Sequence, residues 1–231
     1  MLSSLPLIDA LKGLKPSVSE TSRLKDLTNL AVLQFVQSEK MDILFKNSGT
    51  DKSSNGYSPV YSTLLTPLQG FKSTLIEVGI GTNNINLPSH MGMSGVPGAS
   101  LRAFSIFLGQ ETQIYGLDID RSIFFETETI RCEYVDQLDG DSFTPIKEIL
   151  KKEGGADVII DDGLHRPVSC LNTLTQLLLF LKIGGFFVIE DQDPTLNKYW
   201  NFVLAKLGSH YDWRIVSSRE DISIILIQRT K

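Results

Sequence analysis

The sequence predicts an α/β fold: a seven-stranded, mostly parallel sheet with helices on both faces, an antiparallel C-terminal edge hairpin and a helical N-terminal extension. Two observations carry this prediction. Seven short apolar runs follow residue 70, and four helix-like segments separate most of them. The first runs end in glycines or acids, as parallel strands do at the edge of a sheet where ligands bind. A hydrophobic content of 42% is enough for a full core.

The N-terminal third is predicted to be helical. Residues 19–45 carry apolar side chains at a helical period, with Ser19 or Thr21 as the cap, and residues 60–69 form a second helix that ends near Gly70. The opening stretch MLSSLPLIDALKGLKP reads as a short amphipathic helix and not as a signal peptide. We therefore expect a helical cap with a polar loop over residues 1–70 and a sheet domain over residues 71–231.

Strands and helices alternate along the sheet domain. We expect strands at 73–81, 112–120, 131–137, 156–162, 185–191, 212–218 and 222–230, and helices at 100–108, 144–153, 169–182 and 196–208. Ser100 is the expected cap of the first of these helices. A short polar turn separates the last two strands, which makes them a hairpin.

Charge and cysteine content restrict the function. A net charge of −5 gives no long-range attraction to nucleic acid or to anionic lipid, and the longest apolar stretches are far shorter than a membrane span. Cys132 and Cys170 have no metal-type spacing, and nothing requires a disulfide. We expect a cytoplasmic protein with a small-molecule substrate, without nucleic acid or membrane partners, and leave a homo-oligomer open.

A glycine loop follows the first strand, in LIEVGIGTN. Gly79 and Gly81 allow a sharp turn and a close approach to a ligand, yet the dinucleotide fingerprint is incomplete, because Asn84 stands at its third glycine position. An insertion, residues 82–96, then delays the next helix, and we expect it to cover the pocket. His90 and Met91, within it, are candidates for substrate contact.

Two acids qualify the kind of cofactor. Asp118 ends the second strand, where a carboxylate accepts hydrogen bonds from ribose hydroxyls. Glu77 puts negative charge where a dinucleotide would place its pyrophosphate, which favours a cofactor with a positive amino group. The pair favours S-adenosylmethionine over NAD.

Acids and a histidine follow two further strands. DDGLH holds Asp161, Asp162 and His165, and the next strand ends with Glu190 and Asp191. Neighbouring parallel strands bring these groups to one edge, where a divalent cation relieves their repulsion, and oxygen ligands suit magnesium, manganese or calcium. His165 is the candidate general base. The plainer interpretation, acids that cap helices and solvate loops, is strongest for Asp193, which precedes a proline.

The motifs resemble class I S-adenosylmethionine-dependent methyltransferases, the Rossmann-like seven-stranded kind. The resemblance is narrowest to the metal-dependent macrolide-sugar O-methyltransferases and the related cephalosporin-hydroxylase group. It rests on LIEVGIG, YGLDID, GTDKSSNGYSPVY, GASLR, DDGLH and the acidic pair that ends the following strand. It covers about residue 47 to the C-terminus.

The resemblance implies a role for each matching residue. Asp162, Glu190 and Asp191 would bind a magnesium or manganese ion, and His165 would be the general base. The cofactor would be contacted by Lys52, Tyr57, Glu77, Gly79, Gly81, Asp118, Asp136, Gln137 and Asp161. Two positions depart from the family pattern, Asn55 in place of a histidine and Leu164 in place of a serine. The large N-terminal domain of the macrolide-sugar enzymes is also missing.

The expected function is a divalent-metal-dependent O-methyltransferase that acts on a hydroxyl of a sugar, a glycan precursor or a natural product. Three alternatives stay open at this point. They are a methyltransferase that uses no metal or methylates nitrogen or carbon, a non-catalytic module that binds an adenosyl compound, and a nicotinamide oxidoreductase. Glu77 and the displaced helix argue against the last of these.

Overall fold

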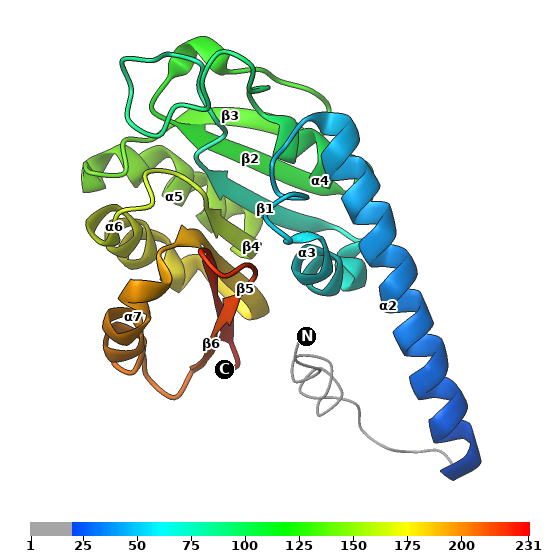
Figure 1. Ribbon diagram of the computed structural model, residues 1–231. Helices are drawn as coiled ribbons and strands as arrows, with labels where there is room; N and C mark the ends of the chain where they lie inside the picture. The colour runs from blue at the N-terminus through cyan, green and yellow to red at the C-terminus, as the bar shows by residue number, and fades with distance from the viewer. Residues whose placement is uncertain (1–19) are drawn as a thin grey trace.

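The computed structural model describes residues 20–231, with side chains from residue 33 onward. The short amphipathic helix predicted at the start of the sequence and the Ser19 cap lie outside the described residues. Helix α2 (Glu20–Ser48) runs along one side of the molecule, and its N-terminal part extends beyond the sheet (Figure 1). A turn of residues 49–57 leads into α3 (Ser58–Leu65), which is shorter than expected because the chain tightens into a 3-10 turn at Pro67.

The predicted sheet is confirmed. Seven strands lie in the order β3-β2-β1-β4-β5-β7-β6, and only β7 runs antiparallel to its neighbours. The strands are β1 (Ser73–Val78), β2 (Thr112–Asp118), β3 (Ile130–Tyr134), β4 (Ala156–Asp161), β5 (Leu181–Gln192), β6 (Tyr211–Ser217) and β7 (Ser223–Arg229). The strand order reverses between β1 and β4, which is where ligands bind in open α/β sheets.

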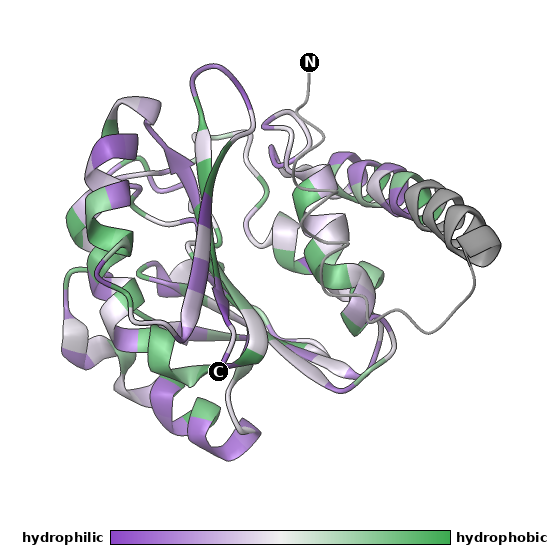
Figure 2. Cartoon of the chain, turned by 90° about the horizontal axis from the view of Figure 1, so that it is seen from below, coloured by the Kyte–Doolittle hydropathy of each residue, from purple (hydrophilic) through white to green (hydrophobic). Residues whose placement is uncertain are grey.

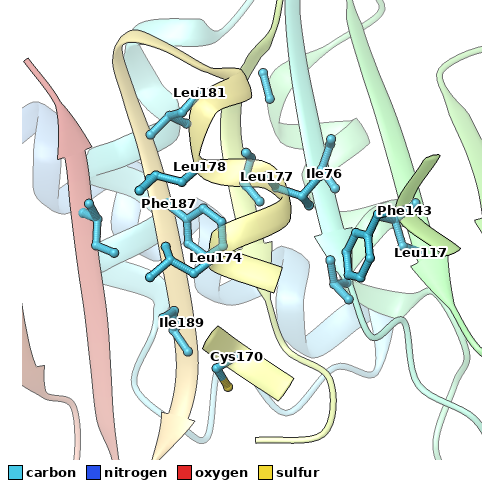
Figure 3. Close-up of a cluster of buried hydrophobic side chains, with 14 of the residues drawn as sticks. Ile76, Leu117, Phe143, Cys170, Leu174, Leu177, Leu178, Leu181, Phe187 and Ile189 are labelled. Carbon is cyan, nitrogen blue, oxygen red and sulfur yellow. The ribbon is translucent and has the colours of Figure 1, made fainter. Parts of the chain in front are cut away.

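Helices cover both faces of the sheet, as Figure 2 shows. They are α4 (Ala99–Leu108), α5 (Thr144–Glu153), α6 (Pro167–Leu177) and α7 (Asn197–Leu204), together with α2 and α3. One apolar cluster packs α2, α3 and α4 on one face, through residues such as Phe45, Tyr61 and Phe104. The second packs α5, α6 and α7 on the other, around Phe187 and Trp200 (Figure 3). Apolar side chains on the two faces of the strands therefore pack into two separate cores.

Two boundaries differ from the expectation. The helix predicted over residues 169–182 ends at Leu177, and β5 begins at Leu181 instead of residue 185. A register shift between Leu181 and Phe186 lets the start and the middle of this long strand both pair with β4. A continuous apolar run such as LLLFL gives no period that separates buried helix from buried strand. Ser100 is also not the cap of α4, because Gly98 takes that place in a left-handed conformation.

No helix in the described part of the chain is long and apolar enough to cross a membrane. Cys132 and Cys170 are both free thiols.

Candidate active site

A cavity of about 660 Å³ opens beside the carboxyl ends of the parallel strands. The glycine loop, the end of β2, the turn after β4 and the insertion of residues 82–96 line it. Its predicted site residues are Gly79, Gly81, Asp118, Asp136, Gln137, Asp162, His165 and Asp191. His90 and Met91 of the insertion also line it, so the insertion covers the pocket as expected.

The two glycines of the loop are required by close contacts. Gly79 has φ +85°, and a Cβ there would lie 2.2 Å from the backbone oxygen of Asp162. Gly81 has φ +81°, and its Cβ would lie 2.3 Å from Met91 Sδ. The first glycine thus lets the β1 loop touch the turn after β4, and the second lets the insertion fold over the pocket.

The insertion is held down by its own polar groups. Asn83 Nδ2 donates to the carbonyl oxygens of Gly92 and Gly95, at 2.5 and 3.0 Å, and the Met91 amide donates to Thr82 O at 2.8 Å. Thr82 Oγ1 in turn donates to Asp120 Oδ2 at 2.5 Å. These bonds fix the wall of the pocket without a helix or strand.

Asp118 is fixed at the end of β2. Its carboxylate accepts backbone N–H bonds from Ile80 at 3.0 Å and from Asp120 at 2.9 Å. Burial raises its pKa in spite of those bonds. Each oxygen keeps a further lone pair, so the carboxylate remains able to accept ligand hydroxyls from the pocket it lines.

An inner set of three carboxylates, Glu77, Asp162 and Glu190, closes around one ammonium group. Lys52 Nζ lies 2.7 Å from Asp162 Oδ2, 2.8 Å from both Glu190 oxygens and 3.1 Å from Glu77 Oε1. Lys52 and the two glutamates are at most 1% exposed. The acids come from the ends of β1, β4 and β5, whereas Lys52 comes from the turn that precedes α3.

Charges in this set control one another. Burial by itself lowers the pKa of Lys52, but attraction to Asp162, Glu190 and Glu77 outweighs it and holds that pKa well above its usual range. Burial raises the pKa of Glu190, and repulsion from Asp162 adds to the rise. The inner set is therefore an ammonium held by three carboxylates, with negative charge left over.

Two tyrosines that follow Lys52 in the chain bond the acidic end of β5. Tyr61 OH donates to Glu190 Oε1, and Tyr57 OH donates to Asp191 Oδ1 at 2.5 Å. Asn55 Nδ2 lies 3.5 Å from the same oxygen of Asp191. Residues 52–61 thus bind the acidic end of β5 with four side chains.

An outer set, Asp162, His165 and Asp191, faces the pocket. One ligand atom from each lies within 4.8 Å of the others, and His165 Nε2 is 4.0 Å from Asp162 Oδ1. His165 and Asp191 have positive φ angles of 54° and 51°, an uncommon conformation for residues other than glycine. Such strain is retained where the surrounding structure fixes it, most often at functional sites.

Gln137 supports the turn that carries His165. Its Nε2 donates to Asp161 Oδ1 and Thr173 Oγ1, both at 2.8 Å, and its Oε1 accepts from the Leu164 amide at 2.7 Å. Asp161 is 1% exposed, and burial raises its pKa. The Gln137 side chain therefore points into the protein and orders the DDGLH turn.

Four of the predicted cofactor residues do not line the cavity: Lys52, Tyr57, Glu77 and Asp161. They lie behind its wall, in the inner set or against Gln137. Glu190, a predicted metal ligand, also lies behind the wall and meets Lys52 and Tyr61 rather than Asp191. Asp193 caps a 3-10 turn through the Thr195 amide, as its plainer interpretation held.

Sequence reasoning assigned no role to Tyr61 and took Ser100 for a helix cap rather than for a partner of Glu77. Ser100 Oγ donates to Glu77 Oε2 at 2.6 Å and also lines the cavity. Both residues lie inside quoted motifs, GTDKSSNGYSPVY and GASLR, but a hydroxyl in a helical segment carries no signal of its distant partner.

Comparisons with known proteins follow the same direction. No family model matches the chain. L-olivosyl-oleandolide 3-O-methyltransferase of Streptomyces antibioticus is 30% identical over 54% of the chain, and mycinamicin VI 2''-O-methyltransferase of Micromonospora griseorubida is 33% identical over 62% of it. The matched segments cover 29% and 32% of those two relatives, so the chain corresponds to only part of their length.

A solved structure shares the fold. MycE methyltransferase from the mycinamycin biosynthetic pathway, in complex with Mg and SAH, superposes with a TM-score of 0.63 at 22% identity, over 83% of this chain and 55% of that one. The matches confirm the resemblance found in the motifs: the chain has the class I methyltransferase fold, and part of it is similar in sequence to these two O-methyltransferases.

Proposed function

We propose that this chain is an S-adenosylmethionine-dependent O-methyltransferase that uses Mg²⁺ or Mn²⁺ and acts on a hydroxyl of a sugar, a glycan precursor or a natural product. The observation that carries the proposal is the outer set. It places two carboxylates and an imidazole on the wall of a cavity that also holds the glycine loop and Asp118. The named functions of the relatives support the same reaction class.

The cavity fits an adenosyl cofactor. A volume of about 660 Å³ lies within the usual range for small-molecule sites. Asp118 would accept the ribose hydroxyls, Asp136 would lie beside the adenine, and the backbone at Gly79 and Gly81 would contact the methionine part. Gln137 would contribute from the cavity lining, and Asp161 and Glu77 would act from behind the wall through their bonds to Gln137 and Ser100.

The outer set fits a divalent cation. Asp162 and Asp191 offer the oxygen donors that Mg²⁺ and Mn²⁺ prefer, both face the cavity, and Tyr57 fixes the orientation of Asp191. Glu190 would join them once a ligand draws its carboxylate away from Lys52. When bound, S-adenosylmethionine would supply an electrophilic methyl group with sulfur as the leaving atom, and Asp162 and Asp191 would hold an ion that orients the acceptor hydroxyl.

His165 would act as the general base. His165 Nε2 would accept the proton of the acceptor hydroxyl as that oxygen takes up the methyl group. Gln137 holds the backbone of the DDGLH turn, so the imidazole stays aimed at the cavity. His90 and Met91 would contact the acceptor from the insertion.

The position of Lys52 supports one alternative, a methyltransferase that uses no metal. The Lys52 ammonium already neutralises part of the charge of the three inner carboxylates, so part of their repulsion is relieved without a metal. A metal-independent methyltransferase would therefore keep the same cofactor site and the same base. A non-catalytic adenosyl-binding module would keep the cofactor site alone.

The test is calorimetric titration with S-adenosylhomocysteine and, separately, with Mg²⁺, on wild type, Asp162→Ala and Asp191→Asn. Asp193→Asn is the matched control, because it is an acid two residues further on that only caps a turn. We expect cofactor binding in all four proteins, and an Mg²⁺ signal in wild type and the control alone.

Each other outcome has a clear reading. Cofactor binding without any Mg²⁺ signal would select the metal-independent alternative. A protein that binds both the cofactor and Mg²⁺ but methylates none of the hydroxylated acceptors offered would support the non-catalytic binding module. Absence of cofactor binding would overturn the proposal.

A further inference from the structure

Glu190 is held by two side chains of the segment that precedes the sheet. Both of its carboxylate oxygens lie 2.8 Å from Lys52 Nζ, and Oε1 also accepts a hydrogen bond from Tyr61 OH. The side chain is 1% exposed and does not line the cavity. Glu190 would therefore have to leave Lys52 before it could bind an ion held by Asp162 and Asp191.

Asp162 differs from Glu190 because its two oxygens face different partners. Its Oδ2 lies 2.7 Å from Lys52 Nζ, whereas Oδ1 lies on the side of the outer set, 4.0 Å from His165 Nε2. Asp162 can thus offer Oδ1 to a cation and keep the ammonium on Oδ2. The inner and outer sets share Asp162, but they cannot share Glu190.

Lys52 stands where the acids themselves would suit a cation. One oxygen each from Glu77, Asp162 and Glu190 lies within 4.8 Å of the others, and Lys52 Nζ is within 3.1 Å of an oxygen of each. The lysine is 1% exposed, and its turn is fixed by the Tyr57 amide, which donates to Lys52 O at 2.9 Å. A buried ammonium stays beside the acids that pair with it, because leaving them would strand its charge.

Two positive charges that need the same carboxylate oppose each other. The ammonium repels a divalent cation across Asp162, and it neutralises the Glu190 carboxylate that the cation would need. Because Lys52 and Glu190 are at most 1% exposed, dissolved salt screens these interactions weakly. The ammonium should therefore lower the affinity of the site for a divalent cation. If Lys52 merely held the acids in place, its loss would have the opposite effect.

We propose that Lys52 is a positioning residue that sets the metal affinity of this site: it competes with the divalent cation for Glu190, and the cation completes its ligand set by drawing Glu190 away from the ammonium. The inference rests on the proposed function, in which Asp162 and Asp191 hold the ion. After Glu190 has moved, Lys52 keeps Asp162 Oδ2 and Glu77 Oε1 as partners. A residue that never touches the metal thus controls how tightly it binds.

The test is titration with Mn²⁺, followed by the electron paramagnetic resonance signal of the free ion. We expect Lys52→Met to bind Mn²⁺ about tenfold or more tighter than wild type, because Glu190 is then free to join the outer set. The double variant Lys52→Met/Glu190→Gln should lose most of that gain, since an amide lacks the charge that attracts the cation. Lys182→Met, whose lysine pairs with Asp157 near the start of β4, removes the same charge and should bind as wild type does.

Two further measurements separate a change in affinity from a loss of fold. Circular dichroism reports whether each variant is folded, and Mn²⁺ should raise the melting temperature of Lys52→Met more than that of wild type. Tyr61→Phe removes a donor to Glu190 without stranding a charge. It should tighten Mn²⁺ binding by about twofold to tenfold, and it tests the competition even if Lys52→Met does not fold.

The outcomes distinguish this proposal from the proposed function. A folded Lys52→Met that binds Mn²⁺ no more tightly than wild type would overturn the competition and leave the metal-dependent function standing. So would an unchanged affinity in Tyr61→Phe if Lys52→Met does not fold, or a double variant that keeps the whole gain. Mn²⁺ binding by Lys52→Met but not by wild type would support the competition and select the metal-independent alternative for the natural chain. Absence of Mn²⁺ binding in every variant would overturn both.

Discussion

At the scale of single residues, Lys52 is the side chain that holds the three carboxylates of the inner set together. In the described part of the chain, it is the lysine that bonds two buried glutamates and the half-buried Asp162 together. A buried ion pair gains little over a well-packed apolar pair, but the loss of one partner leaves charge stranded in a medium that solvates it poorly. Removal of the ammonium should therefore be far more damaging than removal of an exposed one.

Lys52→Met should lower the free energy of unfolding by about 3–5 kcal/mol, measured by urea denaturation. Lys182→Met is the matched control. Lys182 Nζ also lies 2.7 Å from one carboxylate, that of Asp157, but both side chains are 20–30% exposed, so its loss should cost below about 1 kcal/mol. Equal losses of unfolding free energy in the two variants would contradict a stabilising role of the Lys52 ammonium in the inner set.

The effect of pH follows from the sign of the shift. The pKa of Lys52 is raised in the folded protein, so its stabilisation is fully present below its ordinary value of 10.5 and is lost as pH rises through the folded value. In acid, the carboxylates of the inner set protonate and need the ammonium less. The stability difference between wild type and Lys52→Met should therefore be larger near about pH 8 than near about pH 5, by denaturation at both. A constant difference would argue against charge as its cause.

At the scale of elements, the contact between the glycine loop and the turn after β4 joins the two parts of the cavity wall that carry the glycines and the acids. Gly79→Ala should lower stability by about 3 kcal/mol or more, because its Cβ would overlap the Asp162 carbonyl oxygen as well as strain the backbone. Gly154→Ala isolates the strain, since Gly154 has φ +77° and open space around it, and should cost about 1–2 kcal/mol. Thermal unfolding of both variants measures the difference, and equal losses would exclude the overlap.

Elements differed in how far the sequence could predict them. Strands β1, β2 and β4 are short apolar runs that stop at glycine or aspartate. Their existence and their places along the chain were therefore predictable. The α6–β5 junction was not, because its apolar run satisfies a helix and a strand equally. Ser100 was taken for a cap, since a serine at the start of a helix is usually one, whereas its hydroxyl serves Glu77.

At the scale of the whole molecule, the local sequence pattern predicted where the acids and His165 lie but not which residues they contact. Strand ends predict that Asp162 and Asp191 share an edge, because parallel strands end together. Nothing local predicts that a lysine 138 positions before Glu190 would lie against it. The resemblance placed Lys52 over the cofactor, and the structure places it behind the cavity wall. Long-range pairing of this kind follows from the packing of α2 and α3 on the sheet.

The N-terminal helices are part of the core. Met41, Phe45, Tyr57 and Tyr61 are fully buried in the cluster that covers one face of the sheet. A fragment of residues 71–231 would expose that face and leave the inner set without its ammonium. We expect the fragment to lack cooperative unfolding and near-ultraviolet circular dichroism, both measured against the full chain. A fragment that unfolds as sharply as the full chain would make the cap an independent addition.

The link from Lys52 to the inner set also limits how such proteins can be recombined. A chimera joined at Gly70 would take its acids from one parent and their counter-ion from the other, in a space that tolerates no misfit of length or angle. A junction ahead of residue 49 keeps lysine, tyrosines and acids together. For anyone who recombines segments among relatives, the smallest transferable block therefore begins before the sheet does.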